Sequence, residues 1–202
     1  MGQDNDSSAG MSRFEPQKVW DPAIRIWHWM LVFSVVSGWL LGEFRSFSTM
    51  QWHIYAGYTT GILILFRIVW GFIGPPPVRF RALAVTPSTL KKYAGKMLRR
   101  EPSGAAGHNP VGAVSVILML VLLSVQVLTG LFSEDDALFF DGPLASMVSG
   151  STRTTLTAYH QLSSKAVLIV VLLHISAILF YLLWKRENLV KAMITGWKIV
   201  RK

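Results

Sequence analysis

The sequence predicts an all-α membrane protein in which four transmembrane helices form a bundle. Of its 202 residues, 51% are hydrophobic and only 15% are charged, which is too apolar for an ordinary soluble domain. Four apolar runs are each long enough to cross a hydrocarbon core about 30 Å thick. They are residues 24–41, 54–73, 111–132 and 159–184. One four-helix membrane domain accounts for these runs.

The placement of Lys and Arg predicts how these helices are oriented. Basic residues cluster before the first run, between the second and third runs, and after the fourth. The other two connections hold only Arg45 and Arg153, the latter among acidic residues. By the positive-inside rule, both termini are cytoplasmic. The net charge of +9 therefore reflects topology and attraction to anionic membrane lipid, and we expect no nucleic-acid partner.

The chain divides into three parts by composition. Residues 1–16 are polar and rich in Ser and Asp, which predicts a disordered segment. Residues 17–184 hold the four-helix domain, and Asn109-Pro110 is a start signal for its third helix. Residues 185–202 alternate cations with apolar side chains, as a cytoplasmic interfacial amphipathic helix would. The long third connection, 133–158, is expected to fold over the outer mouth of the bundle.

Two histidines in the fourth run carry the strongest functional signal. His160 and His174 are 14 residues apart. That spacing is about 21 Å of helical rise and returns to within roughly 40° of the same face. Ionisable groups inside a membrane span are costly, and they are functional candidates by default.

Two further histidines lie at matching depths on other helices. Under the predicted topology, His28 lies near the cytoplasmic boundary and His53 near the outer one. The pairs His53 with His160 and His28 with His174 then predict two haems, each with two axial imidazoles. Filled axial positions favour electron transfer over oxygen chemistry. The chain has no cysteine, which excludes haem attached through C-x-x-C-H.

Other interpretations of the histidines remain open at this point. Each alone would serve as a polar residue at a membrane interface, and together they could form a proton relay in a haem-free transporter. The optical spectrum of the purified protein separates these possibilities, because only the haem interpretation predicts a Soret band.

Three more residues are candidates around the haems. Arg67 shares the depth of the inner pair and could bind a propionate or a quinone, or simply reach the cytoplasmic interface. Gly57 could let a porphyrin approach the backbone, or serve helix packing. His108 could hydrogen-bond a quinone or a propionate, or be an ordinary polar residue before the third helix.

The chain resembles the bacterial membrane cytochrome b family that contains cytochrome b561 and the b-type cytochrome subunits of nickel-iron hydrogenases. The resemblance spans 19–193 and rests on an ordered set of short motifs. They are Arg25-Ile26-Trp27-His28-Trp29, Glu43-Phe44-Arg45, His53 with Gly57, Arg67-x-x-Trp70-Gly71, Gly107-His108-Asn109-Pro110-x-Gly112, Thr129-Gly130-Leu131-Phe132, and Tyr159-His160 with His174.

The resemblance implies a four-helix bundle in the bacterial inner membrane with two haems b. It puts the axial ligands at His28, His53, His160 and His174. It also implies electron transfer between the quinone pool and a periplasmic redox partner, such as a c-type cytochrome or a hydrogenase-like enzyme, in a homodimer or a hetero-complex. The alternative is a stand-alone superoxide:quinone oxidoreductase. The acidic third connection weakens electrostatic steering of superoxide.

Overall fold

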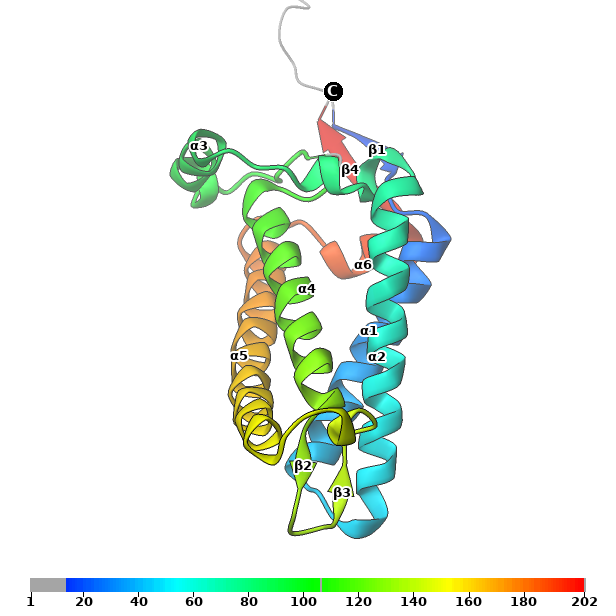
Figure 1. Cartoon of the computed structure of the whole chain (residues 1–202). Coiled ribbons are helices and arrows are strands. Elements are labelled where there is room, and N and C mark those ends of the chain that lie inside the picture. The colour runs from blue at the N-terminus through cyan, green and yellow to red at the C-terminus, as the bar shows by residue number, and fades with distance from the viewer. Residues whose placement is uncertain (1–13, 106, 202) are drawn as a thin grey trace, which may run out of the picture.

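Four long helices run alongside one another through most of the molecule (Figure 1). The computed structural model describes residues 14–105 and 107–201. The helices are α1 (Pro22–Glu43), α2 (Phe47–Ile73), α4 (Pro110–Leu131) and α5 (Gly150–Leu183). All four are long and apolar enough to span a membrane. The chain is therefore a multi-pass membrane protein, and the predicted four-helix bundle is confirmed.

Side chains at the helix starts explain where each helix begins. Asp21, Asn109 and Ser149 accept hydrogen bonds from backbone N–H groups in the first turns of α1, α4 and α5. Ser46 and Thr49 form a capping box at the start of α2. These caps satisfy backbone donors that have no partner within the helix. The start signal predicted at Asn109-Pro110 is confirmed.

The helices α2 and α5 begin well before the apolar runs at 54–73 and 159–184. The α5 helix has 34 residues, about 51 Å of rise, against a hydrocarbon core of about 30 Å. Hydropathy marks only the part of the helix inside the lipid. The polar first turns of α5 therefore extend beyond the membrane, on the side of the connection between α4 and α5.

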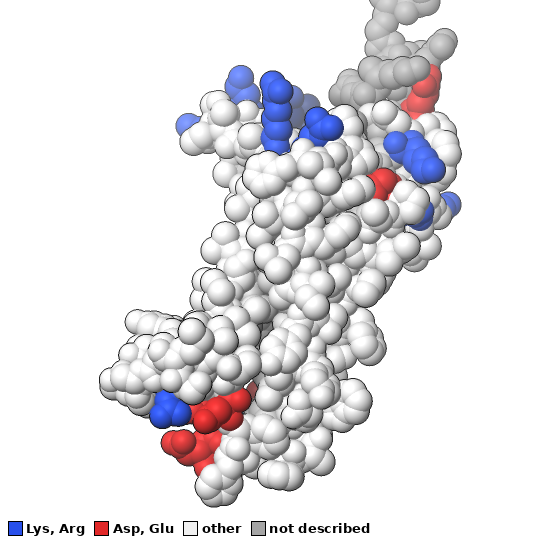
Figure 2. Space-filling view, turned by 45° about the vertical axis from the view of Figure 1, so that its right-hand side comes forward, with Lys and Arg blue, Asp and Glu red and all other residues white. Residues whose placement is uncertain are grey.

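The surface has the pattern expected of a protein in a bilayer. Two large apolar side chains show this pattern: Phe33 of α1 is 76% exposed and Leu65 of α2 is 64% exposed. Figure 2 shows Lys and Arg mainly at one end and an acidic group at the other, with an uncharged band between them. Apolar side chains in such a band are solvated by lipid tails.

Both described ends of the chain meet at the basic end. Strand β1 (Phe14–Lys18) pairs antiparallel with β4 (Trp197–Arg201). The short helix α6 (Leu189–Thr195) precedes β4, and Gly196, with φ of +86°, ends it. In the left-handed region a glycine costs little, so the helix stops there.

The pairing of β1 with β4 differs from what the sequence predicted for the two ends of the chain. The tail helix predicted within 185–202 covers only seven residues, because Lys198 and Val200 are buried with the period of a strand. Residues 1–13 of the segment predicted to be disordered lie outside the described residues, and the next three belong to β1.

The connections close the two ends of the bundle. At the basic end lie η1 (Pro76–Val78), η2 (Phe80–Leu83) and α3 (Pro87–Met97). At the other end, β2 (Glu134–Asp135) and β3 (Phe140–Asp141) form a hairpin, followed by η3 (Ala145–Met147). The third connection is thus folded, as expected. Both closures pack against the ends of helices that carry the candidate histidines.

Candidate functional site

The structure brings together His53 of α2 and His160 of α5 at the end that carries the hairpin. Their ring centroids are 6.0 Å apart, and the ring planes are nearly perpendicular, at 89°. The two imidazoles come from helices that are distant in sequence. The pairing predicted from their depth in the membrane matches this contact.

The hydrogen bonds of both rings favour metal ligation through Nε2. The Nδ1 of His53 lies 2.8 Å from the carbonyl oxygen of Gly38, and the Nδ1 of His160 lies 2.9 Å from that of Gln126. A carbonyl accepts, so Nδ1 carries the proton in each ring. This tautomer leaves the Nε2 lone pair for a metal and fixes the ring orientation.

Gln126 is a polar neighbour of this pair that the sequence analysis missed. Its side-chain amide nitrogen lies 3.1 Å from Nε2 of His160, and its amide oxygen accepts a hydrogen bond from Ser163. A ligand that binds Nε2 of His160 must therefore displace the Gln126 amide. The available signal was the one amide side chain within the third apolar run.

Glycines shape the space around the outer pair. A Cβ atom at Gly42 would lie 2.9 Å from Cε1 of His53, and one at Gly130 would lie 2.8 Å from Cε1 of His160. Gly57 has open space where its Cβ would be. It lines a cavity of about 60 Å³ together with His53, His160 and Gly130. Binding of a large planar cofactor would have to widen this cavity, and the missing side chain at Gly57 makes that easier.

The inner pair lies toward the basic end of the bundle. His28 of α1 and His174 of α5 are close enough to interact electrostatically. Within the described part of the chain, no hydrogen bond uses the buried Nδ1 of His28. The Trp29 ring meets the His28 ring edge-on, with centroids 5.3 Å apart. This pair too joins two different helices, as predicted.

Arg67 is a buried cation beside the inner pair. Its side chain is only 2% exposed, and Nη2 donates to the carbonyl of Val78 at 2.9 Å. The guanidinium carbon lies 5.0 Å from the Phe80 ring centroid and 5.9 Å from that of Trp27. Among described residues, Nη1 has no partner and no carboxylate pairs with Arg67. A buried cation of this kind suits an anionic ligand.

His108 lies in the same region, outside the spans. Its ring packs 4.9 Å from that of Trp20, and its buried Nδ1 has no partner among described residues. The pKa of His108 is lowered to about 4, mainly by burial and in smaller part by nearby charged or titratable groups. In order of effect, those groups are Lys198, Arg67, His174 and His28. The structure therefore gathers all the predicted inner residues around one region.

The donor set fits haem better than a bare metal ion. Among residues 14–105 and 107–201, no group of three or more His, Cys, Asp or Glu side chains could hold a metal ion. Each site instead offers a pair of imidazoles from facing helices. Two axial ligands are what the iron of a b-type haem takes from a protein, since the porphyrin supplies the others.

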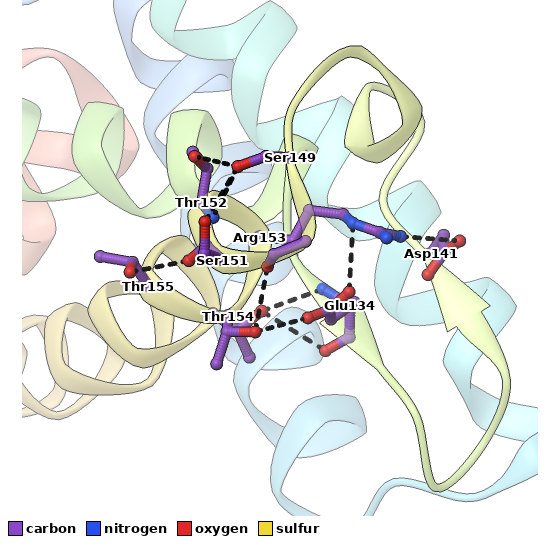
Figure 3. A network of polar contacts seen from close by, with 10 residues as sticks. Glu134, Asp141, Ser149, Ser151, Thr152, Arg153, Thr154 and Thr155 are labelled. Carbon is purple, nitrogen blue, oxygen red and sulfur yellow. Dashed lines mark hydrogen bonds and ion pairs between the residues drawn. The ribbon is translucent and has the colours of Figure 1, made fainter.

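The acidic hairpin is fixed beside the outer pair. Arg153 of α5 lies 3.2 Å from Glu134 and 3.8 Å from Asp141, and Figure 3 shows both contacts. Arg45 pairs with Asp135 at 3.3 Å. Both arginines at this end are therefore partly neutralised by acids, as the sequence suggested.

Comparisons with known proteins agree with this chemistry. The family model described as prokaryotic cytochrome b561 matches residues 19–196. A probable Ni/Fe-hydrogenase B-type cytochrome subunit from Rhizobium leguminosarum bv. viciae is 25% identical over 91% of this chain and 89% of the relative. The probable Ni/Fe-hydrogenase 1 B-type cytochrome subunit of Escherichia coli K12 is 22% identical over 89% of each chain. A similarly named protein of Cupriavidus necator is 25% identical over 98% of this chain and 93% of the relative. No solved structure matches significantly.

Proposed function

This chain belongs to the prokaryotic cytochrome b561 family and transfers electrons across a membrane through haem b; we propose that it holds two haems, each between a pair of histidines. The observation that carries the proposal is the outer pair, in which both rings direct Nδ1–H to backbone carbonyls and keep Nε2 for a metal. When bound, haem b supplies reversible one-electron chemistry at iron.

At the outer site, His53 and His160 would hold the haem iron, and Gly57 would leave room for the porphyrin. The carbonyls of Gly38 and Gln126 orient the two rings by accepting their Nδ1 protons. Such hydrogen bonds from the surroundings of a ligand tune its basicity and thereby the redox potential.

At the inner site, His28 and His174 are the axial ligands in this proposal. Arg67 would bind a propionate through its unpartnered Nη1, which would satisfy a buried cation. Since His160 and His174 are separated by about 21 Å of helical rise, haems held there would lie toward opposite surfaces of the membrane.

The residues at the two ends of the bundle indicate the redox partners. We propose that quinone exchanges electrons at the inner end, where His108 and Arg67 lie, and that a periplasmic redox protein does so at the outer end. The relatives are named as cytochrome subunits of Ni/Fe-hydrogenases, which supports a hetero-complex with a redox enzyme over a simple homodimer. The charge asymmetry supports a bacterial inner-membrane location with cytoplasmic termini.

The superoxide:quinone oxidoreductase alternative receives less support. An anionic donor would need free cations beside the outer pair. Arg45 and Arg153 both pair with carboxylates there, so their positive potential is reduced.

A reduced-minus-oxidised optical spectrum with a pyridine haemochrome assay tests the proposal. Two haems b per chain are expected, and either His53→Ala or His28→Ala should leave one. His108→Ala is the matched control and should keep both, because it is not an axial ligand in this proposal. Absence of haem from the purified wild-type protein would reject the site assignment.

A further inference from the structure

A cluster of exposed cations lies at the basic end, on α3 and on the turn that follows it. Figure 1 shows α3 projecting sideways from the bundle there. Residues 44–100 contain no Asp or Glu, and among the described residues no salt bridge uses any cation of the cluster. Its members are Lys91, Lys92, Lys96, Arg99 and Arg100. Their positive charge is therefore available to a ligand.

The opposite face of α3 packs on the bundle. Tyr93 and Met97 are half-buried, and their spacing of four residues puts them on one face of the helix. The hydroxyl of Tyr93 is hydrogen-bonded to that of Tyr181 in α5. Lys92 and Lys96 are also one turn apart, on the exposed side of α3. The cations of this helix thus point away from the protein.

The turn after α3 is fixed to the end of α5 through its carbonyl groups. The carbonyl of Leu98 accepts a hydrogen bond from Nε1 of Trp184 at 2.9 Å. Lys185 is only 4% exposed, and its Nζ donates to two further carbonyls of the turn, at 3.1 and 3.2 Å. Arg99 and Arg100 are exposed on this anchored backbone. A fixed backbone reduces the entropy that the two guanidinium groups lose when they bind a ligand.

Trp184 places the turn at the edge of the membrane. It directly follows α5, which is long and apolar enough to span a bilayer, and it is 43% exposed. Tryptophan rings favour the level of the lipid head groups. The guanidinium carbon of Arg100 lies 5.2 Å from the Trp184 ring centroid, a cation–π distance. Arg100 is therefore held at the depth of the head groups.

Exposed apolar side chains lie next to these cations. Leu98 is 75% exposed and Leu183 is 73% exposed. Both adjoin Trp184, Leu183 in the sequence and Leu98 through its hydrogen-bonded carbonyl. A ligand that contacts all of these groups has an anionic head and a hydrocarbon tail.

We propose that the turn after α3 and the end of α5 bind an anionic phospholipid, whose phosphate lies between the guanidinium groups of Arg99 and Arg100. Its acyl chains lie along Leu98 and Leu183. Guanidinium groups bind phosphate through paired hydrogen bonds, which suits two neighbouring arginines. Lys96 adds a third charge from the preceding turn, since its carbonyl accepts from the N–H of Arg99 at 3.1 Å.

A phospholipid fits this surface better than a free phosphate or an acidic protein. Basic clusters directly beyond a membrane span attract anionic head groups. A free phosphate would use the arginines and leave the exposed leucines without a role. An acidic protein would approach from water, whereas Trp184 puts this surface at the bilayer boundary.

The test is native mass spectrometry of the full-length holoprotein in detergent, titrated with dioleoylphosphatidylglycerol. Dioleoylphosphatidylcholine has the same acyl chains and a phosphate but no net charge. Glycerol 1-phosphate has the anionic phosphate without acyl chains. The three probes together separate an anionic lipid from any lipid and from free phosphate.

Three variants locate the binding site. Arg99→Gln/Arg100→Gln removes both phosphate donors. Lys18→Gln/Lys191→Gln is the matched control, because it removes two exposed cations of the same end from β1 and α6, which lie away from α3 in Figure 1. Leu98→Glu keeps both arginines and adds a negative charge at an exposed position. The optical spectrum and the melting temperature report whether each variant is folded.

The double arginine variant should bind phosphatidylglycerol about 25-fold more weakly, since each cation near an anionic lipid contributes about fivefold to affinity. Leu98→Glu should weaken binding by at least about fivefold for the same reason. The control should stay within about twofold of the wild type, because distant exposed charges are screened. Wild-type protein should bind the other two probes at least about tenfold more weakly.

Three results would overturn this assignment. Equal losses in the two double variants would mean that the lipid responds only to net charge. Equal affinity for phosphatidylcholine or for glycerol 1-phosphate would remove the need for an anionic lipid. Unchanged phosphatidylglycerol binding in Leu98→Glu would place the lipid elsewhere, and this variant decides the question even if the double arginine variant does not fold.

Discussion

Glu187→Gln should loosen the attachment of the C-terminal strand to the inner end of the bundle. Glu187 and Lys198 form an ion pair at 3.1 Å, and both side chains are only 6% exposed. Glu187 also accepts hydrogen bonds from the backbone and hydroxyl of Ser103, at 2.7 and 2.9 Å. Lys198 also donates to the carbonyl of Gly107 at 3.0 Å. The pair therefore connects β4 with the end of α5 and with the segment before α4.

The distance sets the size of the effect. At 3.1 Å and an effective dielectric constant of about 20, the attraction is about 5 kcal/mol. Breaking a buried pair by removing one partner typically costs about 3–5 kcal/mol, because the other charge stays buried. Glutamine keeps the shape, and its one acceptor oxygen can still accept from the backbone N–H of Ser103. The loss therefore comes mainly from the missing charge.

Hydrogen exchange of the β4 amides measures this loss directly. A cost of about 3 kcal/mol raises the population of the open tail, and so the exchange rate, by about two orders of magnitude. The double variant Glu187→Gln/Lys198→Met removes both charges and should recover much of the protection. The reasoning is refuted if Glu187→Gln exchanges as slowly as the wild type.

Three further predictions concern the two haem sites. Gly130→Ala would put its Cβ 2.8 Å from Cε1 of His160, so the ring must move and the outer haem should be lost. Haem counting on the purified variant checks this loss. Arg67→Gln removes a buried cation and should lower the midpoint potential of the inner haem by about 60 mV, equivalent to about 1.4 kcal/mol. A redox titration measures this potential, and an unchanged value would place the propionate elsewhere. The pKa of His108 is about 4 in the folded protein against about 6.5 unfolded, so the unfolded chain binds more protons between these values. Stability should therefore fall by up to about 3 kcal/mol as pH drops from about 6.5 to 4, and thermal unfolding of His108→Gln should lack this slope.

Much of the bundle could be predicted from local sequence. Apolar length marks each span, and Asn109-Pro110 carries its own start signal. The pairing of β1 with β4 could not be predicted, because it joins segments from opposite ends of the chain. Lys198 illustrates the difficulty. A cation in an alternating tail suggests a membrane surface, but here it lies inward against a carboxylate that no local pattern identifies.

The candidate site likewise has a part that the sequence predicts and a part that it does not. Depth in the membrane was enough to predict the contact between His53 and His160, because the topology fixes the height of each residue along its helix. Rotation about the helix axis was not predictable from hydropathy. For that reason Gln126 and Gly42, which contact the outer rings, were missed, whereas His53 and His160 were found.

The charges around the two pairs give the expected direction of electron transfer. The outer pair is surrounded by backbone carbonyls and the neutral amide of Gln126, and the arginines of that end are paired with acids. The inner region instead holds the buried cation Arg67, which pairs with no carboxylate among the described residues. Reduction removes one positive charge from a haem iron, so a nearby cation favours the ferrous state. The inner haem should therefore have the higher midpoint potential, and electrons should pass from the outer partner toward the basic end. Redox titration of His28→Ala and His53→Ala, each holding one haem, assigns the two potentials. A higher potential at the outer haem would contradict this direction.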